Sequence, residues 1–127
     1  MRLVLSIFFS IICGSGWAQT PVESKSGPYV PLGYCQITSL GSAVALVTAS
    51  CATGSVPTGA TIAEICVETA SVRYRDDGTA PTTTVGMLVA PTSSTIPACF
   101  AYSVIPLTAA QFIAVSGSPV IDVLFYR

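Results

Sequence analysis

The side chains that could support chemistry are concentrated in one short part of this 127-residue chain, which contains no histidine. Carboxylates and guanidinium groups that lie close together can bind a metal ion, exchange protons with a substrate or contact a charged partner. The rest of the chain is nearly neutral, and only 9% of all residues are charged. We call the charged residues of this part the charged stretch and treat them as the candidate interaction patch. They are Glu64, Glu68, Arg73, Arg75, Asp76 and Asp77.

The charged stretch also has the pattern of two short strands. Apolar and polar residues alternate over residues 61–68 and again over 72–75, which is typical of strands with one buried face. If a tight turn joined them, Glu68 would lie opposite Arg73 on the solvent face, an ion pair worth about 0.2–1 kcal/mol. We therefore expect these charges mainly to fix strand register and maintain solubility, with a partner-binding surface as the functional alternative.

Other chemistry is poorly supported by the residues available. Asp76 and Asp77 could contribute to a calcium site, but Asp-Asp-Gly-Thr lacks the repeated acidic positions of a calcium loop. A glycosidase needs two carboxylates about 5–9 Å apart across a sugar cleft. Catalysis by a serine or cysteine triad needs an imidazole, the only lysine is Lys25, and no glycine-rich phosphate loop is present. We expect no catalytic residue, no cofactor and no metal.

The first residues have the pattern of an export signal. Arg2 precedes an apolar run over residues 3–13, and Gly16 and Ala18 are small residues of the kind that signal peptidase requires. The run is shorter than the roughly 20 residues needed to cross a bilayer. We predict a signal peptide over residues 1–18 and no membrane contact after its cleavage; the alternatives are an uncleaved anchor or a buried N-terminal element.

Cleavage would leave four cysteines, Cys35, Cys51, Cys66 and Cys99. An even number in an exported chain indicates two disulfides, and the sequence leaves all three pairings open. Zinc binding would require four widely separated thiolates, because the chain has neither histidine nor a CxxC unit. The cysteines therefore predict an oxidising, extracellular or periplasmic location.

The remaining sequence predicts one all-β domain. Residues 19–32 are rich in proline, glycine and polar residues and indicate an extended linker or arm. Over residues 33–127, short apolar segments alternate with turn-forming clusters, which predicts a single antiparallel β-sandwich or jelly-roll-like domain. A short helical turn is expected within 107–111, and strands are expected at residues 34–39, 43–49, 61–68, 72–75, 86–89, 99–104, 112–115 and 120–126.

Alternation within the expected strands also assigns the core, because successive side chains of a strand point to opposite faces. The carboxylates of residues 61–68 must face water, so the apolar residues between them face inward. The inward-facing residues expected from this pattern are Ala63, Ile65, Val67, Val72, Tyr74, Ile121, Val123 and Phe125.

The numbers of basic and acidic residues indicate whether the chain could bind nucleic acid. The formal net charge is −1, with 5 basic and 6 acidic residues. Nucleic-acid binding requires clustered lysine and arginine to neutralise phosphates. We therefore expect no nucleic-acid partner.

Part of the charged stretch resembles a family pattern. Residues 68–82, ETASVRYRDDGTAPT, followed by Val85, Gly86 and Met87, resemble small structural proteins of tailed bacteriophages and prophages. A looser resemblance extends over most of residues 33–126. It implies a compact β-sandwich on the virion, as a decoration, neck or tail component, that packs against copies of itself or other virion proteins without catalysis.

The sequence is compatible with three functions. The first is a non-enzymatic structural or interaction protein of this phage type, located on a virion or outside the cytoplasm. The alternatives are a secreted bacterial adhesion or glycan-binding module, and a small exported hydrolase. Tyr29 and Tyr34 could contact a partner in the first two cases, although Tyr34 is also expected simply as a strand-edge residue.

Overall fold

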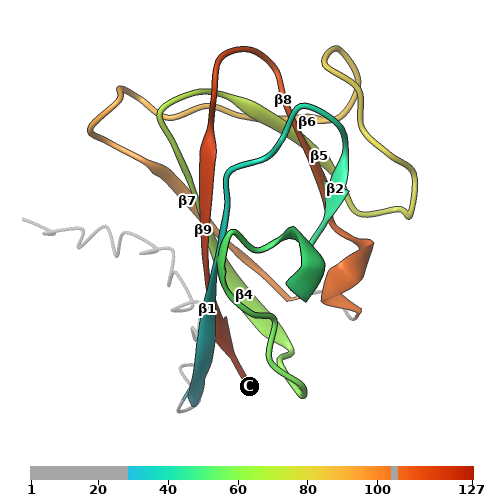
Figure 1. Ribbon diagram of the computed structural model, residues 1–127, viewed down its shortest axis with the longest axis vertical. Coiled ribbons are helices and arrows are strands. Elements are labelled where there is room, and N and C mark those ends of the chain that lie inside the picture. Colours follow the sequence, from blue (N-terminus) through green and yellow to red (C-terminus); the bar gives the residue numbers. More distant parts are fainter. Residues whose placement is uncertain (1–28, 104–105) are drawn as a thin grey trace, which may run out of the picture.

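The computed structural model describes residues 29–103 and 106–127, which fold into two antiparallel sheets (Figure 1). The predicted signal peptide and residues 19–28 of the predicted linker lie outside this part. The strands are β1 (Pro31–Ile37), β2 (Val44–Ala45), β3 (Thr53–Gly54), β4 (Ile62–Glu68), β5 (Val72–Arg75), β6 (Met87–Val89), β7 (Ala98–Tyr102), β8 (Gln111–Ala114) and β9 (Val120–Tyr126).

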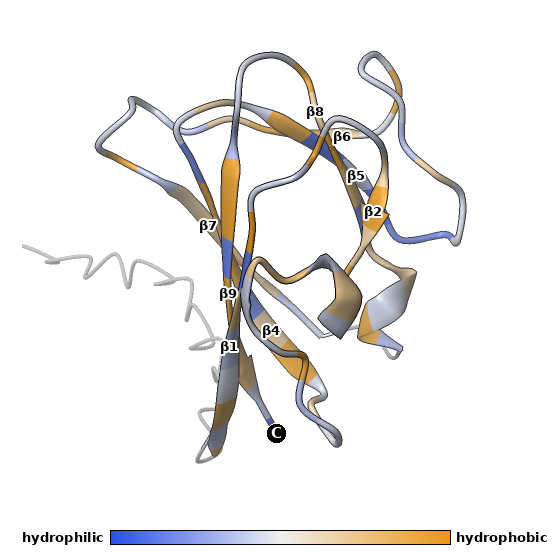
Figure 2. Ribbon diagram, in the orientation of Figure 1, coloured by the Kyte–Doolittle hydropathy of each residue, from blue (hydrophilic) through white to orange (hydrophobic). Residues whose placement is uncertain are grey.

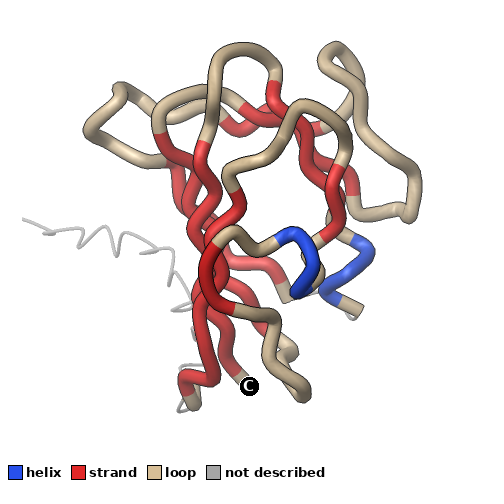
Figure 3. Tube along the Cα trace, viewed as in Figure 1, coloured by secondary structure: helices blue, strands red, loops and turns tan. Residues whose placement is uncertain are grey.

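A five-stranded sheet has the order β3-β1-β9-β4-β7, and a four-stranded sheet has the order β2-β8-β5-β6. Two short 3-10 turns, η1 (Thr48–Ser50) and η2 (Leu107–Ala109), account for the helix in Figure 3. The predicted all-β sandwich is therefore confirmed, and η2 falls within the expected helical turn.

The core lies between the inner faces of the two sheets. The inward-facing residues predicted for 61–68 and 120–126 are fully buried, as is Val72. Hydrophobic colour is concentrated on the strands in Figure 2, whereas many of the connecting loops are pale or blue. The period-2 alternation of these strands thus assigned the core residues correctly.

Three aromatic rings connect the two sheets across this core. Tyr74 of β5 stacks on Phe100 of β7, with ring centroids 5.2 Å apart, and on Phe112 of β8 at 5.9 Å. Because β7 belongs to the five-stranded sheet and β5 and β8 to the other, the stack holds the sheets together at this point.

The edges of the sheets differ most from the sequence prediction. A strand was expected over 43–49, but only Val44–Ala45 is a strand, and the chain then turns into η1. The two-residue β3 was not predicted. β1 begins at Pro31, two residues inside the predicted linker, because the backbones of Val30 and Arg127 exchange hydrogen bonds of 3.1 and 3.2 Å that extend the β1–β9 ladder.

The expected hairpin of residues 61–68 and 72–75 is wrong. β4 already has β9 and β7 as neighbours, so no free edge remains for β5. Thr69 adopts a φ of 66°, and its hydroxyl lies within hydrogen-bond distance of the carbonyls of Glu68 and Ser118, at 2.7 and 2.8 Å. The bend sends β5 into the other sheet, where Arg73 lies opposite Leu88 and Ile113 rather than opposite Glu68.

Candidate functional site

The structure divides the charged stretch between the two sheets. Glu64 and Glu68 point outward from β4 in the five-stranded sheet. Arg73 and Arg75 belong to β5 in the four-stranded sheet, and the two aspartates begin the loop that follows it. The six residues therefore do not form one patch.

The second group of charges organises the loop between β5 and β6. The guanidinium of Arg73 donates to the carbonyls of Thr83 and Gly86 at 3.1 and 2.7 Å. The guanidinium of Arg75 binds both carboxylate oxygens of Asp77, and one of these oxygens also accepts the Thr79 N–H at 3.0 Å. The hydrogen bond from Arg75 holds the pKa of Asp77 below its usual value.

The hydrogen bonds of Asp77 disfavour a calcium site in this loop. Both oxygens of Asp77 are already engaged, whereas calcium requires several free oxygen ligands. Among residues 29–103 and 106–127, no group of three cysteine, aspartate or glutamate side chains could hold a metal ion. The local geometry favours a loop-stabilising role for these charges.

The outward-facing side chains of β1, β4, β7 and β9 form a second candidate surface, which we call the outer face. They combine carboxylates, tyrosines and an exposed leucine. In the register of the sheet, Tyr34, Leu124, Glu64 and Ala101 form one row across it. Tyr34 and Leu124 are 37% and 45% exposed, so this row presents apolar surface to solvent.

One hydrogen-bonded cluster on the outer face joins β1 to β9. The Gln36 amide donates to one carboxylate oxygen of Asp122 at 3.0 Å, and the Tyr34 hydroxyl donates to the same oxygen. The bond to Asp122 is the main cause that raises the pKa of Tyr34 from 10.0 to about 12, with burial and the nearby negative charges adding to it.

This cluster predicts a delayed ionisation of Tyr34. The raised pKa means that the phenol–carboxylate bond stabilises the fold below pH 10 and that this stabilisation is lost between pH 10 and about 12. In an absorbance titration at about 295 nm, Tyr34→Phe should remove one phenol that ionises at about pH 12, and Asp122→Asn should move that phenol towards pH 10. Because burial also raises the pKa of Tyr102, the assignment depends on these variants. A high-pH titration that is unchanged in Tyr34→Phe would contradict the assignment.

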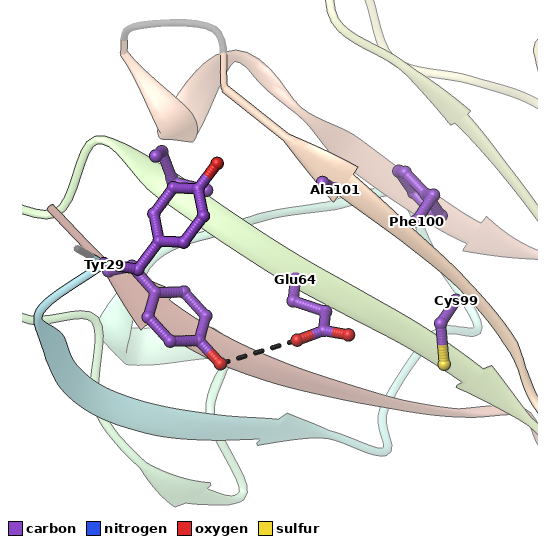
Figure 4. A pocket seen from close by; sticks show the side chains of 7 residues that line it. Tyr29, Glu64, Cys99, Phe100 and Ala101 are labelled. Carbon is purple, nitrogen blue, oxygen red and sulfur yellow. Dashed lines mark hydrogen bonds between the residues drawn. The ribbon is translucent and has the colours of Figure 1, made fainter. Parts of the chain in front are cut away.

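A hollow of about 370 Å³ opens on the outer face near the start of β4 and the end of β9. Figure 4 shows Glu64 between Tyr29 and Cys99 of β7. The rings of Tyr29 and Tyr126 meet edge to face, with centroids 5.9 Å apart and an interplanar angle of 62°. The Tyr126 hydroxyl donates to Glu64 at 3.4 Å. Tyr29 is positioned by the backbone pairing of the next residue, Val30, with Arg127.

The sequence identified only part of this surface. It singled out Tyr29, Tyr34 and Glu64 separately but missed Leu124 and Tyr126. The available signal was the alternation of residues 120–126: their buried partners imply that Leu124 and Tyr126 share the outward side with Asp122.

The cysteines pair as Cys35–Cys51 and Cys66–Cys99, which selects one of the three pairings left open by the sequence. The first pair ties β1 to the segment after η1. The second joins directly opposed residues of β4 and β7 beside the hollow. Two disulfides are compatible with an oxidising, exported location. Within the described residues, no helix has the length and apolarity required to cross a membrane.

A further exposed apolar surface lies on the other sheet, at β6. Met87 and Leu88 are 65% and 53% exposed, and the preceding Val85 is 52% exposed. Neighbouring residues of a strand point to opposite faces, so both faces of β6 are uncovered. Its only partner strand in the described part is β5, which leaves the other backbone edge unpaired there.

Fold and surfaces together define a class: a disulfide-linked antiparallel β-sandwich with an apolar sheet edge on one layer and an acidic, tyrosine-rich face on the other. No family model, curated protein or solved structure matches the chain.

Proposed function

We propose that this domain is a non-enzymatic structural protein that works by packing against other subunits, either copies of itself or other components of a tailed-phage virion. The observation that carries the proposal is the β6 edge. An edge strand with free backbone groups is a template for pairing with another chain, and proteins that keep such edges single usually protect them with charges or proline. Met87–Val89 has neither.

Side-chain exposure supports the same function. Scattered apolar side chains are normal on a protein surface, whereas a group of them marks an interaction site. Val85, Met87 and Leu88 are all exposed along one unpaired edge, with Met87 and Leu88 on its opposite faces. A partner strand added there would satisfy the backbone, and its neighbouring side chains would cover the apolar groups.

The phage resemblance falls on this same region. The residues that carry it, 68–82 and 85–87, form β5, much of the arginine-held loop and the start of β6. The resembling pattern therefore includes Val85 and Met87 of the apolar edge. Two disulfides would suit a protein that functions outside the cytoplasm, on a virion or in another extracellular or periplasmic setting.

One place where a glycan could bind is the hollow at Tyr29 and Tyr126, where tyrosine rings border a carboxylate. Their rings meet at 62° and do not present one flat platform for a sugar. We therefore favour protein packing.

Replacing Met87 with lysine should weaken self-association while leaving the fold intact, because Met87 is 65% exposed. Loss of a central contact at an interface costs more than about 1 kcal/mol, so we expect at least a fivefold weaker association by sedimentation velocity. Recovery in purified particles should fall in parallel.

Ile96→Lys is the matched control, because Ile96 is 54% exposed but lies outside β6. It should associate like the natural chain. A natural chain that is monomeric at all concentrations and absent from particles would contradict the proposal.

A further inference from the structure

The strands of the outer face carry a net negative charge. Three carboxylates point outward from its strands, those of Glu64, Glu68 and Asp122. No lysine or arginine lies within β1, β4, β7 or β9 as the structure describes them, and the single exposed Arg127 follows β9 directly. The arginines of β5 lie in the other sheet, where Arg73 binds loop carbonyls and Arg75 is paired with Asp77. The outer face is therefore complementary to a cationic partner.

Within this face, the groups that could attract a cation lie together around the hollow. Glu64 is the only charged residue in its lining, and the surrounding groups are mainly aromatic or aliphatic. The Tyr126 hydroxyl binds one Glu64 oxygen, and the other oxygen has no hydrogen-bond partner among the described residues. A carboxylate bordered by apolar groups interacts more strongly with a cation than one fully surrounded by water.

The tyrosine pair adds a second attraction. Because the rings meet at 62°, their faces point in different directions. A cation within about 6 Å of a ring centroid is attracted to the ring face, by about 0.5–1 kcal/mol at an exposed site. The methylene stem of a long cationic side chain could pack on Ile62 and Ala101, which also line the hollow.

Other ligand classes fit these groups less well. A divalent metal requires several oxygen ligands, whereas the lining supplies one carboxylate. An anion would be repelled by Glu64. A sugar favours a flat aromatic platform, which the edge-to-face rings do not form. The volume of about 370 Å³ is near the lower end of the usual range for small-ligand sites, about 300–1,000 Å³.

We propose that this hollow binds a lysine or arginine side chain of a partner protein. The partner inserts the cationic group between Glu64 and the two tyrosine rings, and its surrounding surface contacts the exposed row at Tyr34 and Leu124. The inference rests on the proposed function in that the partner is a protein, but it concerns a surface separate from the β6 edge.

The test titrates the full chain with N-acetyl-lysine methylamide or its arginine equivalent, while NMR follows the backbone amides of residues 62–66 and 99–101. The uncharged norleucine equivalent is the control ligand. Both cationic probes should cause saturable shifts that weaken with added salt, and norleucine should cause none. Glu64→Gln should weaken binding at least about fivefold, the factor that corresponds to about 1 kcal/mol.

Glu68→Gln is the matched control, because it removes a carboxylate from the same strand outside the hollow. It should change affinity less than about twofold, since exposed charges at a distance are screened by salt. The proposal would be overturned by equal effects of the two substitutions, by absence of binding, or by preferential binding of norleucine or of neutral N-acetylglucosamine. The measurement does not depend on assembly, so it remains informative even if β6 variants associate normally.

Discussion

Replacing Cys35 and Cys51 together by alanine should lower the free energy of unfolding by about 3 kcal/mol. Their disulfide closes a loop with a sequence separation of 16, and the chain-entropy cost of closing such a loop is about 3 kcal/mol. Cys35 is also fully buried in the core, so its removal costs packing as well. Urea titration of the oxidised natural chain and the double variant measures the difference.

The other disulfide supplies the comparison. Cys66 and Cys99 are separated by 33 residues, so their paired replacement should cost a similar or slightly larger amount, about 3–4 kcal/mol. Neither is fully buried, however, and their strands are already joined by a ladder. The loss should therefore arise mainly from the greater freedom of the unfolded chain.

Alkylation of the same variants tests the pairing itself. In protein that lacks residues 1–18, and with them Cys13, each matched double variant should have no free thiol, because the remaining two cysteines still pair. Replacing Cys35 and Cys66 together should instead leave Cys51 and Cys99 alkylatable without reductant. Free thiols in a matched variant would contradict the observed pairing.

The sequence predicted most of the central strands because their burial pattern is local. In residues 61–68 and 120–126, each apolar residue alternates with a more exposed one, and both strands lie inside the five-stranded sheet. The edge strands β2 and β3 have two residues each. Their existence depends on which strand they meet, information that no local period carries.

The candidate site was harder to predict because it depends on pairing between distant strands. The charged stretch is continuous in sequence, but the bend at Thr69 sends its two halves into different sheets. Conversely, Glu64 meets Tyr126 only because β4 pairs with β9. Strand order could not be derived from alternation, which defines the face of a residue but not its neighbours.

Phe112→Ala should cause the largest loss of stability among the variants considered, about 3–5 kcal/mol. Phe112 is fully buried and stacks on Tyr74, whose ring also stacks on Phe100 of the other sheet. Truncation therefore leaves a cavity in the contact between the layers. Because domains of this size are stable by only about 5–15 kcal/mol, the variant should unfold at a much lower denaturant concentration.

Leu124→Ala is the matched control, since it truncates a large apolar side chain that points outward from β9 and is 45% exposed. It should change stability by no more than about 0.5 kcal/mol. Similar losses in the two variants would contradict the assignment of inner and outer faces.

The effect of Phe112→Ala should also extend to function. Tyr74 lies opposite Met87 in the β5–β6 ladder, so a loosened Tyr74 ring gives less support to the strand that carries the proposed packing edge. Weakened self-association of folded Phe112→Ala, measured at low denaturant, would connect the aromatic stack to the β6 edge.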